Sequence, residues 1–147
     1  MASATKPMTG GCLCGAVRFT ATPAARHVDA CHCGMCRRWS AGPAMMVDCG
    51  DSVTFTEKTG LAFYRSSDWG ERGFCNRCGS SLCYRLVEQG HTFMSVETFD
   101  DREGFTFTMQ IFTDEKPDYY AFANKTKTMT GAEVFTAFAS DANQAKG

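Results

Sequence analysis

The sequence lacks an excess of positive charge, and this absence limits its possible ligands. The 147 residues include 15 lysines and arginines against 16 aspartates and glutamates, so the formal net charge is -1 at pH 7. Proteins that bind nucleic acids neutralise phosphates with clustered lysines and arginines. We therefore expect no nucleic acid among the partners of this protein.

Long hydrophobic runs are also lacking. No stretch approaches the roughly 18 consecutive apolar residues that indicate a membrane-spanning helix. The first nine residues, MASATKPMT, contain no apolar segment of the kind found in secretory signal peptides. From these two absences we expect no membrane partner and a cytoplasmic location.

The chain has little helical periodicity and no linker-like segment. Short apolar or β-branched runs, such as Ala16–Thr22, Ala44–Val47 and Ser81–Val87, alternate with turns that contain Gly, Asp and Ser. Many short strands at regular spacing are typical of mainly β sandwiches or barrels. We therefore expect one mainly β domain over residues 9–139, with an N-terminal tail at 1–8 and a C-terminal tail at 140–147.

Helix is expected in few places. One turn of helix is predicted directly after Cys33, and it would carry Arg37 and Arg38. The segments Pro117–Phe122 and Glu133–Phe138 are too short for their patterns to distinguish helix from strand.

Cysteine, by contrast, is abundant. Seven of the nine cysteines lie in three tight clusters, namely Cys12 and Cys14, then Cys31, Cys33 and Cys36, then Cys75 and Cys78. Without a secretion signal, thiols at such spacing indicate metal ligation or catalysis rather than disulfides. Zinc selects thiolates and binds them in tetrahedral sets. The count of seven predicts two Zn²⁺ ions per chain, one with four thiolates and one with three.

The first and third clusters together supply the four thiolates of a closed structural zinc site. Alternate residues of a strand point to the same face, so Cys12 and Cys14 can bind one ion while Leu13 turns into the core. Cys75 and Cys78 form a knuckle that directs two sulfurs to one point. We predict a structural zinc bound by Cys12, Cys14, Cys75 and Cys78.

The middle cluster supplies only three thiolates, from Cys31, Cys33 and Cys36. His32 lies on the opposite face of an extended segment and is not an expected ligand. A zinc ion with three protein ligands keeps one position for water or substrate, which distinguishes catalytic from structural sites. These three cysteines are therefore the candidate catalytic residues and the ligands of a catalytic-type zinc.

Two other interpretations of the middle cluster stay open. It can be a second structural site completed by Cys49, Cys83 or a histidine, or Cys33 and Cys36 can form a redox pair. If zinc binds three thiolates, the site is negatively charged and suits exchange of a soft sulfur ligand. A small-molecule thiol is thus the expected substrate.

Two arginines follow the middle cluster directly. The guanidinium groups of Arg37 and Arg38 match carboxylates in shape and charge. They are the candidate substrate-binding residues for a thiol that carries carboxylates.

Several segments resemble the motifs of one known family, and they occur in the same order. These segments are Gly11–Val17, Cys31–Arg38, Gly73–Leu82 and Thr98–Asp101. The family is that of the glutathione-dependent formaldehyde-activating enzymes, which includes centromere protein V. The resemblance extends roughly from Thr9 to Phe122.

The resemblance implies a zinc-binding, β-tent-like fold of short antiparallel strands, with a structural zinc on the first and third clusters and a catalytic-type zinc on the middle one. The implied activity is of the carbon–sulfur lyase type, in which glutathione and formaldehyde condense to S-hydroxymethylglutathione.

The chain departs from the family at Gln110-Ile111, where His-Ile is common, and at Tyr119 and Tyr120, where a Trp is common. The alternative function is a non-catalytic zinc-binding interaction module, and a homodimer is compatible with either.

Overall fold

The computed structural model of the protein describes residues 5–146, and the side chains of residues 5–139. These residues form two compact units. The first unit holds the described chain up to Val28 together with Met45–Thr106, and the second holds Asp29–Ala44 and the chain from Phe107 onward. The protein is mainly β with antiparallel sheets, which confirms the predicted fold class. A single domain over residues 9–139 stays a prediction.

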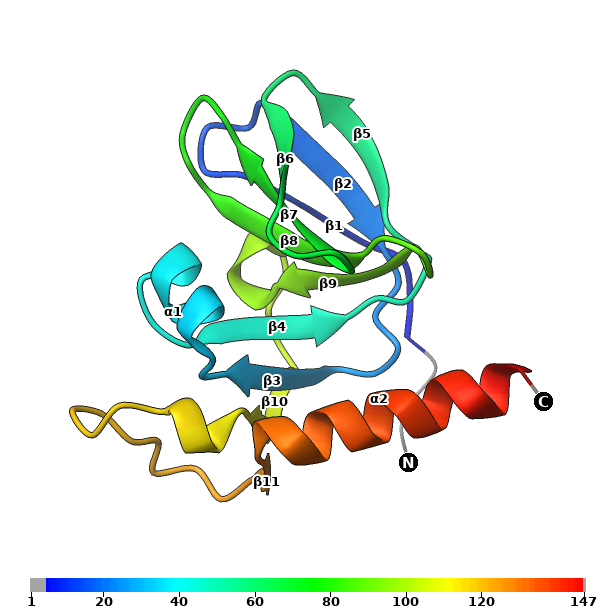
Figure 1. Ribbon diagram of the computed structural model, residues 1–147. Helices are drawn as coiled ribbons and strands as arrows, with labels where there is room; N and C mark the ends of the chain where they lie inside the picture. Colours follow the sequence, from blue (N-terminus) through cyan, green and yellow to red (C-terminus); the bar gives the residue numbers. More distant parts are fainter. Residues whose placement is uncertain (1–4, 147) are drawn as a thin grey trace. The chain divides into compact units, whose positions relative to one another are not determined.

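One sheet of the first unit contains three antiparallel strands in the order β1-β2-β5 (Figure 1). The strands are β1 (Met8–Gly11), β2 (Val17–Ala21) and β5 (Thr54–Lys58). Alternate residues of β2 are buried, as the sequence pattern predicts. Gly10 of β1 has no room for a side chain, because a Cβ atom there would lie 2.4 Å from the ring of Phe19.

The other strands of the first unit are antiparallel in the order β4-β9-β8-β7-β6. They are β4 (Ala44–Asp48), β9 (His91–Ser95), β8 (Ser81–Leu86), β7 (Gly70–Cys75) and β6 (Leu61–Arg65). Strand β7 was not expected, because two glycines and two charged residues hide its pattern. Those glycines make room for neighbours: the Tyr84 side chain covers Gly70, and the Cys83 sulfur lies against Gly73.

The buried apolar side chains of the first unit form one hydrophobic cluster. The short 3-10 helix η1 (Val96–Thr98) leads from β9 to Phe99, which is fully buried. The rings of Phe99 and Phe19 meet edge to face, with centroids 5.4 Å apart. Other members of the cluster include Val17, Val47, Leu82 and Met94. Burying an aromatic side chain of this size stabilises a fold by about 1.5–3 kcal/mol.

The turn after η1 is bound to the first sheet by main-chain and side-chain contacts. Phe99 pairs with Gly10 of β1, and the Asp100 N–H donates to the carbonyl of Thr9 over 3.0 Å. The Asp100 carboxylate accepts from the Thr9 hydroxyl and forms an ion pair with Arg18. The Arg18 guanidinium lowers the pKa of Asp100 to about 2. The Thr98–Asp101 motif thus has a structural role.

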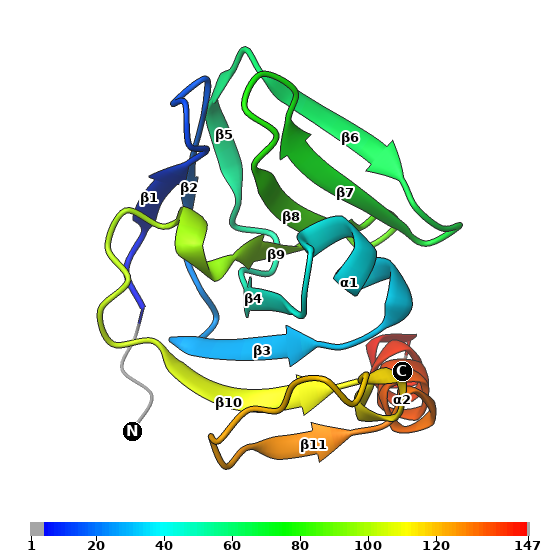
Figure 2. The same ribbon diagram turned by 90° about the vertical axis from the view of Figure 1, so that its left-hand side faces the viewer.

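The second unit contains strands in the order β11-β10-β3, which lie side by side in Figure 2. They are β3 (His27–Cys31), β10 (Thr106–Ile111) and β11 (Lys127–Met129), and β10 and β11 are parallel. The unit also contains the 3-10 helix η2 (Thr113–Glu115). Most of β3 and β10 belongs to this unit, because the boundary falls near the first residues of both strands.

Two α-helices complete the second unit. Helix α1 (Gly34–Ser40) begins directly after Cys33 and carries both arginines, as predicted. Helix α2 (Gly131–Lys146) is longer than the segment Glu133–Phe138 for which helix or strand stayed open. Thr130 and Glu133 form a reciprocal capping box at its start, with N–H···O distances of 3.2 and 2.9 Å. Within residues 5–146, neither helix combines the length and apolarity that crossing a bilayer requires.

Replacing the central ring of the first unit should weaken the fold strongly. We expect Phe99→Ala to lower the free energy of unfolding by about 3–5 kcal/mol, because it leaves a cavity in the hydrophobic cluster. The matched control is Tyr64→Ala on β6, where the side chain is 65% exposed and the cost should stay within about 1 kcal/mol. Urea denaturation of the metal-loaded protein measures both values, and equal losses would contradict this view of the core.

Candidate functional site

The first and third cysteine clusters meet in the first unit. The sulfurs of Cys12, Cys14, Cys75 and Cys78 all lie within 4.8 Å of one another. The Sγ atoms of Cys12 and Cys14 are 3.7 Å apart, and those of Cys14 and Cys75 are 3.8 Å apart. With Zn–S bonds of about 2.3 Å, the sulfurs of a tetrahedral site are about 3.8 Å apart. The four thiols therefore fit one zinc ion.

The expected position of Leu13 is wrong. Its side chain is 89% exposed and does not enter the core. Cys12 and Cys14 do not lie on a strand but on a tight turn after β1, in which the Gly15 N–H donates to the Cys12 carbonyl over 3.2 Å. Gly15 has a φ of 84°, a conformation that favours glycine. The turn, rather than strand alternation, brings the two sulfurs to one side.

Backbone N–H groups donate to the sulfurs of this four-cysteine group. The Val17 N–H lies 3.2 Å from the Cys12 sulfur, and the Arg77 N–H lies 3.4 Å from the Cys75 sulfur. Gly79, with a φ of 79°, closes the knuckle by donating its N–H to the Cys75 carbonyl. Such bonds orient the sulfurs and favour their ionised form, which is the form that binds metal.

Ser80 connects the two halves of the four-cysteine group, a role that no sequence pattern predicted. The Leu13 N–H donates to the Ser80 oxygen over 3.0 Å, so the Ser80 hydroxyl is free to donate to the Cys78 sulfur, 3.2 Å away. The hydrogen bond from Ser80 lowers the pKa of Cys78 to about 5. This hydrogen bond therefore favours the thiolate form of Cys78.

The middle cluster lies in the second unit, at the junction of β3 and α1. Cys31 ends β3, Cys33 caps α1 by accepting from the Cys36 N–H over 3.4 Å, and Cys36 lies in the first turn. Their sulfurs lie within 4.8 Å of one another, and no other Cys, His, Asp or Glu of residues 5–139 joins the group. The pKa of Cys31 is raised by the thiols of Cys33 and Cys36 and by burial. A metal ion among the three sulfurs would favour their ionised form, so this group also fits a metal ion.

The other cysteines lie apart from both groups. Cys49 and Cys83 belong to the hydrophobic cluster of the first unit, and burial raises the pKa of each to about 12. This places them among inert, buried thiols. None of the nine cysteines forms a disulfide in this structure.

His32 points away from the middle cluster, as predicted. The side chain is fully buried, with Nε2 2.8 Å from the Gln110 amide oxygen and Nδ1 2.7 Å from the Tyr120 hydroxyl. The main-chain N–H of His32 donates to the Ile111 carbonyl, and its carbonyl accepts from Arg37 Nε over 2.9 Å. Because both ring nitrogens have protein partners, His32 does not complete the metal group.

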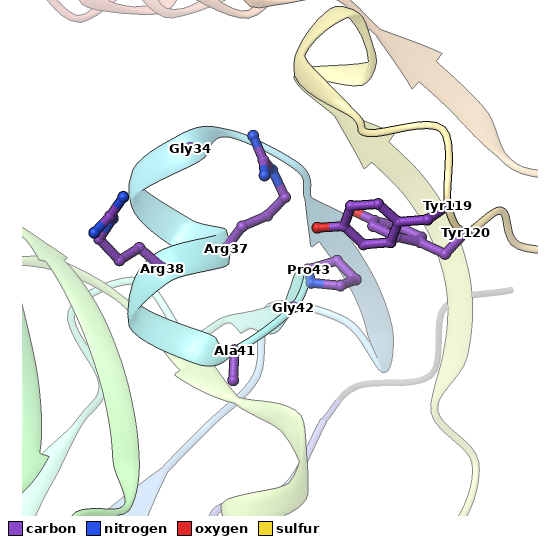
Figure 3. Close-up of a pocket in the computed structure, with 8 residues that line it drawn as sticks. All are labelled: Gly34, Arg37, Arg38, Ala41, Gly42, Pro43, Tyr119 and Tyr120. Carbon is purple, nitrogen blue, oxygen red and sulfur yellow. The ribbon is translucent and has the colours of Figure 1, made fainter.

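A cavity of about 650 Å³ lies on the second unit next to the middle cluster (Figure 3). It is lined by Gly34, Arg37, Arg38, Ala41, Gly42, Pro43, Tyr119 and Tyr120. Figure 3 shows both tyrosine rings pointing toward α1 and the side chain of Arg37. Both predicted substrate-binding arginines are therefore at the cavity. The tyrosines were noted only as departures from a motif, since a separation of more than 80 residues hides their contact with α1.

The electrostatics of the cavity favour an anionic ligand. Arg37 and Arg38 both line the cavity, although in Figure 3 the Arg38 side chain extends from the side of α1 that lies away from the tyrosines. The Nε bond from Arg37 to the His32 carbonyl orients that guanidinium. Burial raises the pKa of Tyr120 although the Arg37 charge opposes this, so the phenol keeps its proton at neutral pH.

The sequence model of one family, described as glutathione-dependent formaldehyde-activating enzyme, matches residues 7–115. The chain belongs to this family. Among its relatives is an uncharacterised lyase of Schizosaccharomyces pombe, 36% identical over 126 residues that cover 85% of this chain and 92% of the relative. A Halomonas elongata protein named as a glutathione-dependent formaldehyde-activating enzyme is 34% identical over 126 residues, which cover 76% of this chain and 78% of that protein.

A solved structure resembles this member of the glutathione-dependent formaldehyde-activating family. The crystal structure of a Rhodobacter sphaeroides protein matches it with a TM-score of 0.55 and 20% sequence identity. The match covers 63% of this chain and 88% of that protein. At this identity the comparison shows a shared fold and nothing of the activity.

Removing one sulfur of the four-cysteine group should cost both a metal ion and the fold of the first unit. We expect Cys75→Ser to bind one zinc ion fewer than the wild type and to lose the cooperative unfolding transition, because binding of structural zinc contributes directly to folding. Elemental analysis and circular dichroism measure the two effects. The control is Cys49→Ala, a buried cysteine outside both groups, which should keep the metal content. A Cys75→Ser protein with undiminished zinc would contradict the predicted ligand set.

Proposed function

We propose that the protein is a zinc-dependent enzyme of the carbon–sulfur lyase type that acts on a small-molecule thiol, glutathione, and on formaldehyde or a related small aldehyde. The observation that carries this proposal is a group of three cysteines at the start of α1, the helix whose Gly34, Arg37 and Arg38 line a cavity. Membership of the family, and the names of the two relatives, support the same reaction class.

The proposed division of the metals follows the ligand count. Cys12, Cys14, Cys75 and Cys78 would hold a structural Zn²⁺, and Cys31, Cys33 and Cys36 would hold a second Zn²⁺. Zinc at the three-cysteine group would supply a site where a substrate thiol binds and loses its proton. Two ions per chain are thus part of the proposal.

The residues of the cavity would bind and orient the thiol. Glutathione carries two carboxylates, and the Arg37 guanidinium can donate two parallel hydrogen bonds to one of them. Arg38 adds a second positive charge on the same helix. Because Cys33 caps α1 and Arg37 lies four residues later, the carboxylate and the thiol would be held at a fixed separation. Such orientation accounts for much of the rate gain in a two-substrate reaction.

The reaction is a balanced addition without a redox change. The sulfur of glutathione forms a bond with the aldehyde carbon, the C=O π bond breaks, and the proton released by the thiol ends on the new hydroxyl. The product is S-hydroxymethylglutathione when the aldehyde is formaldehyde. No electron acceptor or further substrate is needed.

The first test compares turnover in the wild type and in a variant of the three-cysteine group. We expect zinc-loaded wild type to form S-hydroxymethylglutathione faster than a protein-free mixture, and Cys33→Ser to lose at least about 95% of that excess rate while staying folded. Serine is a good N-cap residue, so α1 should persist. Exchange NMR measures the rates and circular dichroism the fold. A wild type with no excess rate would refute the proposed reaction and favour the interaction module.

The second test concerns recognition of the carboxylate. We expect Arg37→Met to raise KM for glutathione about ten- to a hundredfold with little change in kcat, because a charge-assisted hydrogen bond contributes about 1.5–3 kcal/mol. The matched control is the substrate: 2-mercaptoethanol has no carboxylate, so its KM should change less than about twofold. Equal losses with both thiols would show that Arg37 does not bind the carboxylate.

A further inference from the structure

A chain of hydrogen bonds crosses the second unit from a backbone carbonyl to the cavity. The Thr126 hydroxyl is 2.9 Å from the Lys127 carbonyl oxygen, and the Gln110 amide nitrogen is 3.1 Å from the Thr126 hydroxyl. The Gln110 amide oxygen is 2.8 Å from Nε2 of His32, and Nδ1 of His32 is 2.7 Å from the Tyr120 hydroxyl. None of these contacts was predicted from the sequence.

The Lys127 carbonyl oxygen determines which group donates and which accepts in each of these hydrogen bonds. A carbonyl oxygen can only accept, so the Thr126 hydroxyl donates to it and accepts from the Gln110 NH₂ group. The amide oxygen of Gln110 then faces His32 and accepts from an Nε2–H group. In neutral imidazole the other ring nitrogen has no proton, so Nδ1 of His32 accepts from the Tyr120 hydroxyl.

The ring of Tyr120 is held on several sides, so its hydroxyl has a defined place. It stacks on the His32 ring with centroids 5.5 Å apart and a 28° angle between the planes. Phe122 meets it edge to face at 6.3 Å, and the Lys116 ammonium lies 5.1 Å from the ring centroid. The chain of hydrogen bonds therefore sets which way the hydroxyl proton points, and packing sets where the oxygen lies.

Tyr120 also lines the cavity, where the arginines supply only hydrogen-bond donors. With its proton directed to His32, the Tyr120 oxygen offers the cavity a lone pair, which is an acceptor. An acceptor beside the Arg37 guanidinium complements a ligand that carries a carboxylate and a hydrogen-bond donor close together. An α-amino acid group, with its carboxylate and ammonium on one carbon, has this chemistry.

We propose that Gln110 is a positioning residue that acts through His32: it fixes the imidazole tautomer, and thereby makes the Tyr120 oxygen an acceptor for the α-amino acid group of the substrate thiol. The proposal rests on the proposed function in one respect, namely that the cavity takes a thiol of the glutathione class. A glutamine suits the position because its amide donates to Thr126 and accepts from His32 at the same time. A methionine of similar volume can do neither.

The first experiment determines which ring nitrogen of His32 carries the proton, and it needs no substrate. Long-range ¹H–¹⁵N NMR of the zinc-loaded protein, with His27→Asn and His91→Asn used to assign the three histidines, should show His32 as the Nε2–H tautomer. In Gln110→Met, Nε2 has no acceptor, and we expect the Nδ1–H tautomer to become populated. Wild-type His32 as the Nδ1–H tautomer, or an unchanged tautomer in Gln110→Met, would overturn the inference.

A matched variant separates this effect from loss of packing. The ring of Phe122 contacts His32 at a centroid distance of 5.9 Å but offers no polar group. We expect Phe122→Leu to lower the melting temperature and to leave the tautomer of His32 unchanged. The same tautomer shift in Phe122→Leu would show that Gln110 acts only by general packing, and would overturn its positioning role.

The second experiment tests whether Gln110 acts through Tyr120. Gln110→Met should raise KM for glutathione about two- to tenfold with kcat nearly unchanged, the range expected for one neutral hydrogen bond. In a Tyr120→Phe background, which already lacks the oxygen, Gln110→Met should raise KM no further. Additive increases would contradict the inference. If the wild type proves inactive with glutathione, the proposed function fails, while the tautomer measurement still decides the role of Gln110.

Discussion

Repulsion between closely spaced sulfurs is the constraint on which the rest of this structure depends. The fold brings four cysteines together in the first unit and three in the second, each group with its sulfurs within 4.8 Å of one another. Thiolates at this spacing repel one another, and a cation among them would offset this repulsion. The S–S distances of 3.7 and 3.8 Å in the four-cysteine group are those that tetrahedral zinc requires. If zinc binds these groups as proposed, metal binding and folding of this chain would be coupled.

The two groups differ in their surroundings as well as in number. The sulfurs of the four-cysteine group accept from backbone N–H groups and from the Ser80 hydroxyl, which suits a permanently occupied structural site. The three-cysteine group is joined to a helix whose outer residues face a cavity lined by arginine and tyrosine. In the proposed function, the three-cysteine group would hold the sulfur of a small thiol and the cavity would bind its carboxylates.

Local patterns were sufficient for much of the fold and for the two groups of cysteines that could hold a metal ion. Strands β2, β4, β8 and β10 follow apolar runs that are visible in the sequence, and α1 begins at the expected cysteine. Strand β7 could not be predicted from its own residues. Its glycines leave room for the side chains of Tyr84 and Cys83, which belong to another strand. Leu13 was placed in the core because a turn was taken for a strand, and only the conformation of Gly15 distinguishes the two.

The sequence by itself determined which residues can bind metal, because ligand spacing within a few residues is a local property of the backbone. It also determined that Arg37 and Arg38 follow the three-cysteine group on one short helix. Only the tertiary structure decided that Tyr119 and Tyr120 form the opposite wall of the cavity, and that Gln110 lies against His32. These contacts join residues 78 or more positions apart. No local pattern encodes them, since they exist only when β3 and β10 pair and when the chain after η2 packs against both.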